Sequence, residues 1–580
     1  MSTRKKRSTK FLKLAELSEQ IMATTKRLEK MDLAGAFLQS LPNDEIEPAS
    51  LLLIGLPFPR GSKRTLDISW ASLWDLIKEL LNPEQETVSK YFRQSGDIGE
   101  VIRRLYIDSG GVSQKTLFST PITIPEVYKT FENIADVGGS GARRKKAALL
   151  RSLFTRATAL EAKYLAKILV GDQRIGFSEG MLESTISRVF KIPLPLIRRA
   201  NMLTGNIGKV AYIAKVDGTI GLKKVKLKPF TPLLPMLAAQ AKDINDVLDQ
   251  HEGESAFEMK LDGARIQIHS KQKNGEHQTR IYSRRLTDVT ISLPDIVILV
   301  NKEIKALSCI LEGEVLSVGP NGRPYPFQHL MRRFRRVHDV EQMVKEIPVT
   351  LQLFDLLMLD NDVLIDTPYI QRRKRLKSIS GKIPLVPQIV TKDPEKVKQF
   401  FELSIQQGHE GLVAKRLDSL YKLGIRGKAW LKVKKTMESL DLVIIAAEYG
   451  TGRRHKWLSN YHLAVWDPET SQYQTLGKTF KGLTDEDFEE ITQRLLSLKT
   501  DQDRNIVFVR PQIVVETEYD EIQKSPTYKS GMALRFARIK RIIYDKSSKE
   551  ADTFQRVLEL YKSQFKRKAP IKKEREKARK

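Results

Sequence analysis

The chain has 580 residues, enough for three or four domains of ordinary size, and 41% of them are hydrophobic, so packed cores are expected throughout. A net charge of +29 predicts polyanionic partners, with a solubilising basic surface as the alternative, and charge alone does not choose between DNA, RNA and anionic lipid. The single cysteine, Cys309, excludes an internal disulfide and a zinc site built from several cysteines.

The N-terminal segment, residues 1–10, is a short basic arm. It lacks the apolar stretch of a secretory signal, and no apolar run in the chain is long enough to span a bilayer. We therefore expect an intracellular, cytoplasmic protein with no membrane partner.

Residues 11–225 carry the pattern of an all-α domain. Apolar residues such as Leu17 and Ile21 recur at helical spacing, with turn clusters between the helical runs. Within this region, residues 95–101 (Ser-Gly-Asp-Ile-Gly-Glu-Val) echo residues 204–210 (Thr-Gly-Asn-Ile-Gly-Lys-Val). Each segment would open a helix whose unpaired amides can bind a phosphate, and two ordinary helix N-caps are the alternative.

A proline-rich linker at residues 229–235 opens the next region, in which strands alternate with helices up to about residue 436. Residues 349–357 are an apolar, β-rich run, and residues 394–407 have the pattern of an amphipathic helix. The region is therefore expected to be an α+β domain covering residues 226–436.

Lys260 is the most informative residue of this domain. Residues 257–259 alternate as a strand, Asp262 and Gly263 signal a turn, and residues 264–269 alternate again, which predicts strand, turn and strand. A lysine amine attacks phosphorus well only when neutral, and nearby cations or burial can lower its pKa enough. The pattern suggests a lysine that accepts a nucleotidyl group. From these few residues alone, however, the alternative of a hairpin with a surface lysine is favoured, because short motifs often match by chance.

Charged residues two positions apart share a face on two further strands. One strand carries Lys432 and Lys434, downstream of Arg426, and these cations can neutralise a phosphate as negative charge builds on it. Another carries Glu312 and Glu314. A solvated strand face is the alternative for the two lysines. No G-x-x-x-x-G-K-[ST] sequence occurs, so a bound nucleoside triphosphate would depend on side chains of this kind.

From residue 441 a new series of short strands and turns continues to about residue 545, which predicts a small β-barrel. Residues 562–580 form a tail dense in Lys and Arg. A solubilising role and a nonspecific DNA tether are both open for this tail.

Taken in chain order, these segments resemble the covalent nucleotidyltransferases, which comprise DNA ligases, RNA ligases and mRNA capping enzymes. Residues 260–265 match their nucleophile motif K-x-D-G-x-R. Residues 534–541 with 545–546 are similar to the last motif of ATP-dependent DNA ligases. The other matching segments are residues 282–288, 311–314, 353–355, 410–415 and 430–434. Over residues 11–561 the chain is similar to the three-domain ligase of archaea, itself similar to the eukaryotic replicative enzyme.

The resemblance implies an all-α N-terminal DNA-binding domain (residues 11–225), an α+β nucleotidyltransferase or adenylation domain (226–436) and a β-barrel OB-fold domain (437–561). It implies ATP-dependent sealing of nicks in duplex DNA, through a lysyl-AMP intermediate and an adenylated 5′-phosphate, in replication, repair and recombination. ATP and Mg²⁺ are the implied cofactors, and nicked double-stranded DNA is the implied partner.

A monomer associated with the nucleoid is expected on the same grounds. A sliding clamp is a family-based partner only, since no clamp-binding peptide of the Q-x-x-φ-x-x-aromatic-aromatic type occurs near residues 1–12.

The resemblance also assigns roles to single residues. Lys260 is the nucleophile, Glu258 reads the adenine edge and Phe354 stacks on the base. Glu314 lies near the ribose or a metal, and Glu410 at a metal. Contacts to the nucleotide or a phosphate are assigned to Arg265, Arg284, Arg426, Lys432 and Lys434. The barrel residues that would swing over ATP to orient pyrophosphate, and then leave for DNA, are Arg535, Arg538, Lys540 and Lys546.

The chain departs from the family at two positions, since many ligases have Arg where Ile543 stands and Pro where Ala537 stands. A further basic cluster, residues 328–336, resembles a segment typical of archaeal ligases, with a basic helix face as the alternative. The bacterial NAD-dependent ligases resemble the catalytic core too, but they carry a cysteine zinc module that this chain lacks.

Two other functions are weighed against DNA ligation. RNA ligases and capping enzymes share the K-x-D-G core but generally lack a helical N-terminal domain like residues 11–225. A non-enzymatic DNA-binding scaffold is the second, and it would not need the complete set of Lys260, Glu314, Glu410, Lys432 and Lys434.

Overall fold

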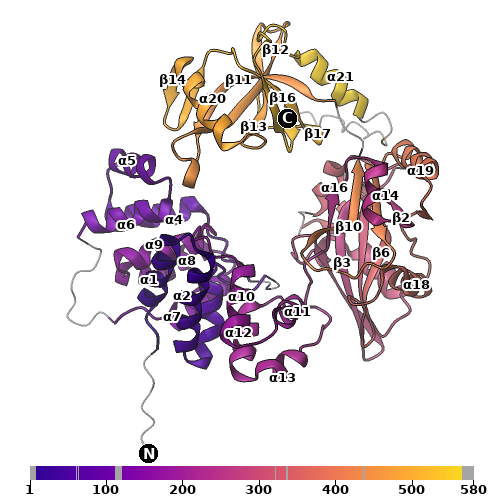
Figure 1. Ribbon diagram of the computed structural model, residues 1–580, viewed down its shortest axis with the longest axis horizontal. Coiled ribbons are helices and arrows are strands. Elements are labelled where there is room, and N and C mark those ends of the chain that lie inside the picture. Colours follow the sequence, from indigo (N-terminus) through magenta and orange to yellow (C-terminus); the bar gives the residue numbers. More distant parts are fainter. Residues whose placement is uncertain are drawn as a thin grey trace, which may run out of the picture.

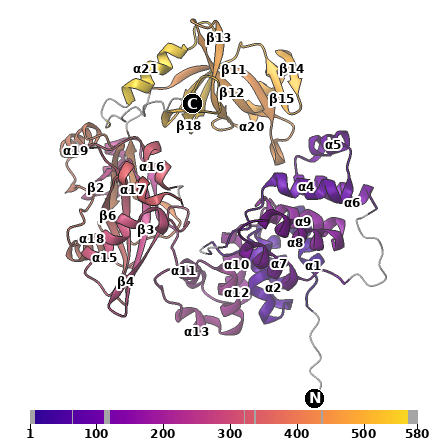
Figure 2. The same ribbon diagram turned by 180° about the vertical axis from the view of Figure 1, so that it is seen from behind.

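The structure is a computed structural model. It describes residues 8–60, 62, 64–110, 120–319, 322–334, 338–434, 438–564 and 568. A helical lobe, a central lobe of sheets and helices, and a strand-rich C-terminal lobe lie in a ring (Figure 1, Figure 2). Most of the predicted arm (residues 1–10) and tail (562–580), and the expected domain boundary at residue 436, lie outside the described residues.

The helical lobe is all-α, as predicted. Its helices bury their apolar faces in one core that includes Phe11, Leu52 and Phe131. Residue-specific caps start several helices: at α9 the Thr158 hydroxyl accepts from the Glu161 amide, and the Glu161 carboxylate accepts from the Thr158 amide. The helices are α1 (Phe11–Ala23), α2 (Arg27–Ser40), α3 (Ile46–Leu53), α4 (Trp70–Leu81), α5 (Gln85–Ser95), α6 (Ile98–Asp108), α7 (Ile124–Asp136), α8 (Ala142–Arg156), α9 (Ala159–Leu169), α10 (Glu179–Val189), α11 (Leu194–Thr204), α12 (Ile207–Val216) and α13 (Gly218–Lys223).

The two echoing segments have the same local structure. Asp97 caps α6 and Asn206 caps α12, and each cap follows a glycine in the left-handed region, Gly96 with φ 59° and Gly205 with φ 61°. The first segment meets the C-terminal lobe, where the Gly452 amide donates to the Gly96 carbonyl at 3.1 Å. Phosphate binding by these segments stays a prediction.

The central lobe contains two five-stranded sheets, in which neighbouring strands are antiparallel except β1 and β10. The first sheet has the order β1 (Leu237–Gln240), β10 (Arg426–Lys434), β9 (Gly411–Arg416), β2 (Ser255–Lys260) and β8 (Gln388–Thr391). The second has the order β4 (Glu276–Ser283), β3 (Ala264–Lys273), β5 (Ser308–Ser317), β6 (Val349–Leu359) and β7 (Asp362–Val363). The helices of this lobe are α14 (Ile244–His251), α15 (Pro294–Glu303), α16 (Phe327–Phe334), α17 (Val340–Glu346), α18 (Tyr369–Ile379) and α19 (Pro394–Gln406). The predicted strand at residues 349–357 and helix at residues 394–407 are confirmed as β6 and α19.

Lys260 lies where the two sheets meet. It ends β2 in the first sheet, and β3 begins at Ala264 in the second. The predicted strand, turn and strand are therefore confirmed, but the alternative of a hairpin is wrong, because β2 and β3 do not pair with each other. The turn packs closely on β5: a Cβ atom on Gly263 would lie 2.5 Å from the Val315 carbonyl oxygen.

The C-terminal lobe is built mainly of strands, as predicted. A seven-stranded sheet has the path β13-β12-β11-β15-β14, with β16 pairing with β11 and β19, and β17 pairs separately with β18. The pairings among the described strands do not close a barrel, so the closed barrel of an OB-fold stays a prediction. The elements are β11 (Leu440–Tyr449), β12 (Leu458–Asp467), β13 (Gln472–Thr479), α20 (Asp485–Ser497), β14 (Lys499–Asp503), β15 (Ile506–Val509), β16 (Val514–Glu518), β17 (Glu521–Lys524), β18 (Met532–Arg535), β19 (Arg538–Ile543) and α21 (Phe554–Gln564).

Polar contacts join each pair of lobes. The helical and C-terminal lobes meet through the Gly96–Gly452 hydrogen bond, and the helical and central lobes through the ion pair of Arg199 with Asp366. The central and C-terminal lobes meet where Gln328 donates to Gln523 at 2.6 Å. Within the described part of the chain, no helix is long and apolar enough to cross a membrane.

Candidate active site

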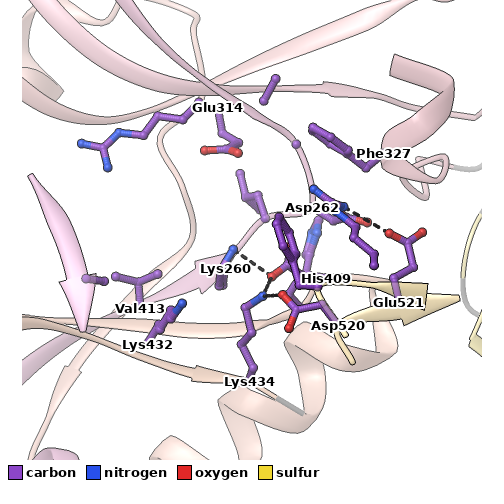
Figure 3. Close-up of a pocket in the computed structure, with 18 of the residues that line it drawn as sticks. Lys260, Asp262, Glu314, Phe327, His409, Val413, Lys432, Lys434, Asp520 and Glu521 are labelled. Carbon is purple, nitrogen blue, oxygen red and sulfur yellow. Dashed lines mark hydrogen bonds and ion pairs between the residues drawn. The ribbon is translucent and has the colours of Figure 1, made fainter. Parts of the chain in front are cut away.

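A cavity of about 1950 Å³ is lined by both sheets of the central lobe and by the C-terminal lobe. Every residue that the sequence predicted for the nucleotide or the metal lines this cavity, although these residues span seven strands and loops far apart in the chain. Figure 3 shows how Lys260, Glu314 and Lys434 lie in it. They are Glu258, Lys260, Arg265, Arg284, Glu314, Phe354, Glu410, Arg426, Lys432 and Lys434.

Lys260 is paired with a carboxylate inside the cavity. Its Nζ atom lies 2.9 Å from Glu410 Oε2, and the same oxygen lies 2.8 Å from Lys434 Nζ. Burial opposes the charged amine, yet the carboxylates of Glu410 and Glu314 raise the pKa of Lys260 above its ordinary value. The expected lowering of this pKa is thus wrong for this arrangement, because the neighbouring acids outweigh burial. Burial would raise the pKa of Glu410, but the charges of Lys260 and Lys434 lower it to about 2, so this side chain is an ionised carboxylate.

A group of cations surrounds one end of the cavity. Burial lowers the pKa of Arg284, and the charges of Arg265 and Arg426 lower it further. Burial also lowers the pKa of Lys432, together with repulsion from Lys434, Lys260 and Arg426. Like charges held this close are costly unless an anion joins them, so this end of the cavity suits a polyphosphate.

Aromatic rings line the other part of the cavity, which we call its aromatic end, and they pack against buried charged side chains. Phe354 and Trp430 meet edge to face, with ring centroids 6.4 Å apart, and both line the cavity. The Arg265 guanidinium lies 5.2 Å from the Phe354 ring and donates to Glu312 at 2.7 Å. Arg265 is thus committed to Glu312, while Glu314 alone of the two glutamates on β5 lines the cavity. This end suits a flat base.

The C-terminal lobe contributes two of the four predicted closure residues. Arg535 and Arg538 line the cavity, and Arg535 also pairs with Glu521 at 3.2 Å. Lys546 instead pairs with Asp441 at 2.6 Å, and Lys540 with Glu516 at 2.9 Å, and neither lines the cavity. A pyrophosphate role for any of the four stays a prediction.

Comparison with protein families matches three models along the chain. They are described as DNA ligase N terminus (residues 10–187), ATP dependent DNA ligase domain (235–434) and ATP dependent DNA ligase C terminal region (454–546). A DNA ligase of Thermococcus fumicolans is 41% identical over 555 residues, which cover 95% of this chain and 98% of the relative. The chain belongs to the ATP-dependent DNA ligases.

Other relatives agree with this assignment. DNA ligase 1 of Korarchaeum cryptofilum is 42% identical over 96% of this chain and 98% of its own length. A solved structure titled Pmar-Lig_PreS3 has a TM-score of 0.57 over 91% of this chain and 99% of that chain, at 19% identity, which is a likeness of fold. Archaeal three-domain organisation was therefore predicted correctly, and the chain is an enzyme of the ligase family.

Several residues of the ligase cavity were not singled out from the sequence. Lys415 and Trp430 line it, although they were noted only as parts of matching segments. Lys415 is two positions after Val413 on β9 and both residues line the cavity, so strand alternation relates the two once the face of one of them is known. His409 and Asp520 also line the cavity, and no sequence signal marked either of them.

The carboxylates around Lys260 are suitable ligands for a magnesium ion whose remaining ligands are substrate phosphates. Burial raises the pKa of Glu314 to about 7 against the opposing charges of Lys260 and Arg265, so a cation would stabilise its charged form. In the described ranges, no group of three or more His, Cys, Asp or Glu side chains could hold a metal ion by itself. Mg²⁺ commonly binds one or two carboxylates plus substrate phosphates, and Glu314 and Glu410 suit that mode.

Proposed function

We propose that this ligase seals nicks in duplex DNA and carries AMP on Lys260. The observation behind the proposal is the place of the Lys260 amine, between two carboxylates and a group of cations in one cavity. In the first step Nζ attacks the α-phosphorus of ATP, an N–P bond forms and pyrophosphate leaves. AMP then passes to the 5′-phosphate of the nick. Finally the 3′-hydroxyl attacks that phosphate and AMP leaves.

Lys260 must lose its proton before it attacks, since only the neutral amine is a nucleophile. Glu410 Oε2, 2.9 Å from Nζ, accepts a hydrogen bond from the ammonium and stabilises its charged form, and with its own lowered pKa it is too weak a base to take this proton. While the pair persists, Glu410 holds the ammonium in place and the lysine unreactive. Lys260 therefore becomes reactive only when another cation pairs with the Glu410 carboxylate in its place.

The nucleotide lies along the cavity, with its base at the aromatic end and its phosphates at the cationic end. Phe354 stacks on the base and Glu258 reads its edge. Lys432 and Lys434 neutralise the α-phosphate as charge builds, and Arg284 and Arg426 bind the nucleotide or the nick phosphate. Donors fixed in place before the reaction need no reorganisation in the transition state.

Glu314 and Glu410 are the residues that would hold Mg²⁺. When bound, the ion offsets negative charge on the phosphates. Arg535 and Arg538 then orient pyrophosphate from the C-terminal lobe, which moves away before DNA binds. Lys546 and Lys540 join them only if that lobe rotates further than in the present arrangement.

The helical lobe holds the DNA, chiefly by its phosphates. The DNA-binding, adenylation and OB-fold domains of this ligase comprise residues 11–225, 226–436 and 437–561. The protein works as a monomer on chromosomal DNA inside the cell, in replication, repair and recombination. A sliding clamp remains a partner suggested by the family alone.

One experiment tests this function against its alternatives. The protein is incubated with ATP or GTP labelled at the α-phosphate, the covalent adduct is isolated, and it is chased with nicked DNA or nicked RNA. An AMP adduct discharged by nicked DNA is expected. A GMP adduct would indicate a capping-type enzyme, discharge by nicked RNA alone an RNA ligase, and no adduct at all a non-catalytic scaffold.

A further inference from the structure

Glu258, at the aromatic end of the cavity, is held by donors from three other elements. Its Oε2 atom lies 2.6 Å from Lys415 Nζ on β9. Its Oε1 atom accepts from the Tyr369 hydroxyl and from Arg373 Nη1 at 3.2 Å, both on α18, and from Gln388 Nε2 at 3.3 Å on β8. The Glu258 side chain is only 4% exposed, so its orientation is set by these contacts.

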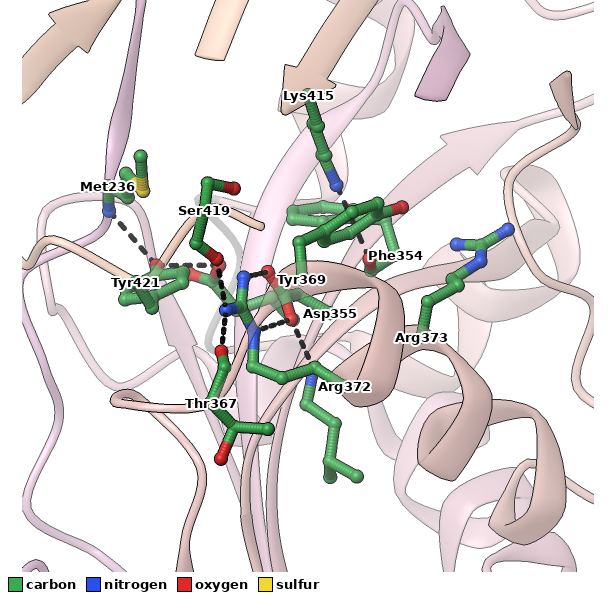
Figure 4. Close-up of polar contacts among 12 residues, drawn as sticks. Met236, Phe354, Asp355, Thr367, Tyr369, Arg372, Arg373, Lys415, Ser419 and Tyr421 are labelled. Atoms are coloured by element: carbon green, nitrogen blue, oxygen red, sulfur yellow. Dashed lines mark hydrogen bonds and ion pairs between the residues drawn. The ribbon is translucent and has the colours of Figure 1, made fainter. Parts of the chain in front are cut away.

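Lys415 ties Glu258 to the predicted stacking residue. Its ammonium lies 4.7 Å from the centre of the Phe354 ring and 4.4 Å from that of Trp430, and it donates to the Phe354 carbonyl at 3.3 Å (Figure 4). The Lys415 side chain is 2% exposed. One buried cation therefore positions both the group that reads the edge of the base and the ring that stacks on it.

The two oxygens of Glu258 differ in what they have left to accept. Three donors occupy Oε1, whereas Oε2 has the single donor Lys415 among the described residues. An ionised carboxylate has no proton to give and about four acceptor positions in all. The open position is thus on Oε2, next to Lys415, and both residues line the cavity.

From this geometry we infer that Lys415, Tyr369, Arg373 and Gln388 are positioning residues that set the choice of purine, by presenting Glu258 to the base as a fixed acceptor. The inference rests on the proposed function, in which Glu258 reads the base. A purine with an amine at its 6-position donates to Oε2. A purine with a carbonyl there places lone pair against lone pair in a buried site, which is strongly unfavourable.

The test compares adduct formation from ATP and from inosine triphosphate, which differ at the 6-position without the 2-amine of guanine. We expect the wild type to prefer ATP at least ~100-fold in kcat/KM. Tyr369→Phe and Gln388→Leu each remove one donor and should reduce that preference about tenfold, chiefly through KM for ATP. Lys374→Met, an exposed change on the same helix, should leave the preference unaltered.

A second pair of variants tests the orientation of Glu258. In Glu258→Gln the three donors at Oε1 require the amide oxygen there, so its NH₂ group faces the Lys415 ammonium, which also donates. This variant should be slow with both nucleotides. Adding Lys415→Met removes the opposed donor and leaves the amide free to donate to a carbonyl, so the double variant should be faster with inosine triphosphate than Glu258→Gln and should prefer it to ATP.

Several results would overturn the inference. One is a wild type without preference between the two nucleotides. Another is Tyr369→Phe and Gln388→Leu variants that slow both nucleotides equally, which is the mark of a merely structural role. Because these two variants suffice, loss of folding in the Lys415 variants would not decide the matter. Failure of the proposed function is distinguishable, since the wild type would then form no adduct, or Lys260→Arg would form one.

Discussion

The Asp520 carboxylate of the C-terminal lobe lies 3.4 Å from the Lys434 ammonium of the central lobe, across the active-site cavity. Lys434 also lies 2.8 Å from Glu410, so in this arrangement it stands between two carboxylates. A phosphate bound by Lys434 would repel Asp520. The contact that closes the two lobes and a bound nucleotide therefore compete for one cation.

Asp520→Asn should consequently lower the KM for ATP in adduct formation. The Asp520 side chain is 52% exposed, so we expect only a two- to threefold effect, about the size of an exposed ion pair. Sealing of nicked DNA that is already adenylated should not change. Asp503→Asn, the same charge change on the exposed strand β14, is the control. Equal effects of both variants would mean that net charge, and not this contact, is responsible.

Lys260→Ala should abolish the covalent adduct with labelled ATP. Lys260→Arg should be equally inactive, because a guanidinium stays protonated and cannot attack phosphorus. Both variants should still seal nicked DNA that is already adenylated, which does not need the amine as a nucleophile. Peptide mapping of any residual label checks the assignment, and label on another lysine would contradict it.

Much of the active site follows from alternation along single strands. Lys432 and Lys434 share a face of β10, as expected, and both line the cavity. The strand, turn and strand around Lys260 were also predictable, because Asp262 and Gly263 are local turn signals. Local pattern does not contain which sheet each strand joins, and it is the pairing of β2 with β9 and of β3 with β5 that excludes the hairpin alternative.

Contacts between distant segments were not predictable in the same way. Arg265 pairs with Glu312 because β3 and β5 lie side by side, and that register depends on the whole sheet. Tyr369 and Gln388 reach Glu258 from more than a hundred residues away. The contact of Asp520 with Lys434 depends on how the C-terminal and central lobes are oriented relative to each other. Residue spacing along the chain does not predict that orientation.

The junction between the helical and C-terminal lobes should matter for DNA and not for ATP. A Cβ atom on Gly96 would lie 2.5 Å from His455 Cβ, so Gly96→Ala should disrupt the contact with Gly452. We expect nick sealing to fall about fivefold at moderate salt and to depend less steeply on salt concentration, because fewer phosphate contacts are made at once. Adduct formation should be unchanged.

Gly110→Ala is a matched control for that variant. Gly110 also has a positive φ, 71° against 59° for Gly96, but a Cβ atom there meets nothing within 4 Å among the described residues. Both substitutions therefore carry a left-handed strain of about 1 kcal/mol, and only one disturbs the junction. If the two variants seal nicks alike, backbone strain explains the loss and the junction has no role in sealing.

Arg538 and Lys546, both predicted to act on pyrophosphate, should now behave differently. Arg538 lines the cavity, whereas Lys546 pairs with Asp441 outside it. We expect Arg538→Ala to slow adduct formation at least ~10-fold, the usual cost of losing one charged donor to a phosphate. Lys546→Ala should slow it less. Given nicked DNA that is already adenylated, both variants should seal at close to the wild-type rate. An equal loss in adduct formation would show that the C-terminal lobe turns further than in this arrangement and brings Lys546 to the pyrophosphate. An equal loss in both assays would instead assign these residues to DNA binding or to stability.

Ile543→Arg extends the comparison, because many relatives have arginine there. If this variant forms the adduct faster and seals adenylated DNA at an unchanged rate, the last motif of this ligase is a weakened form of the usual clamp.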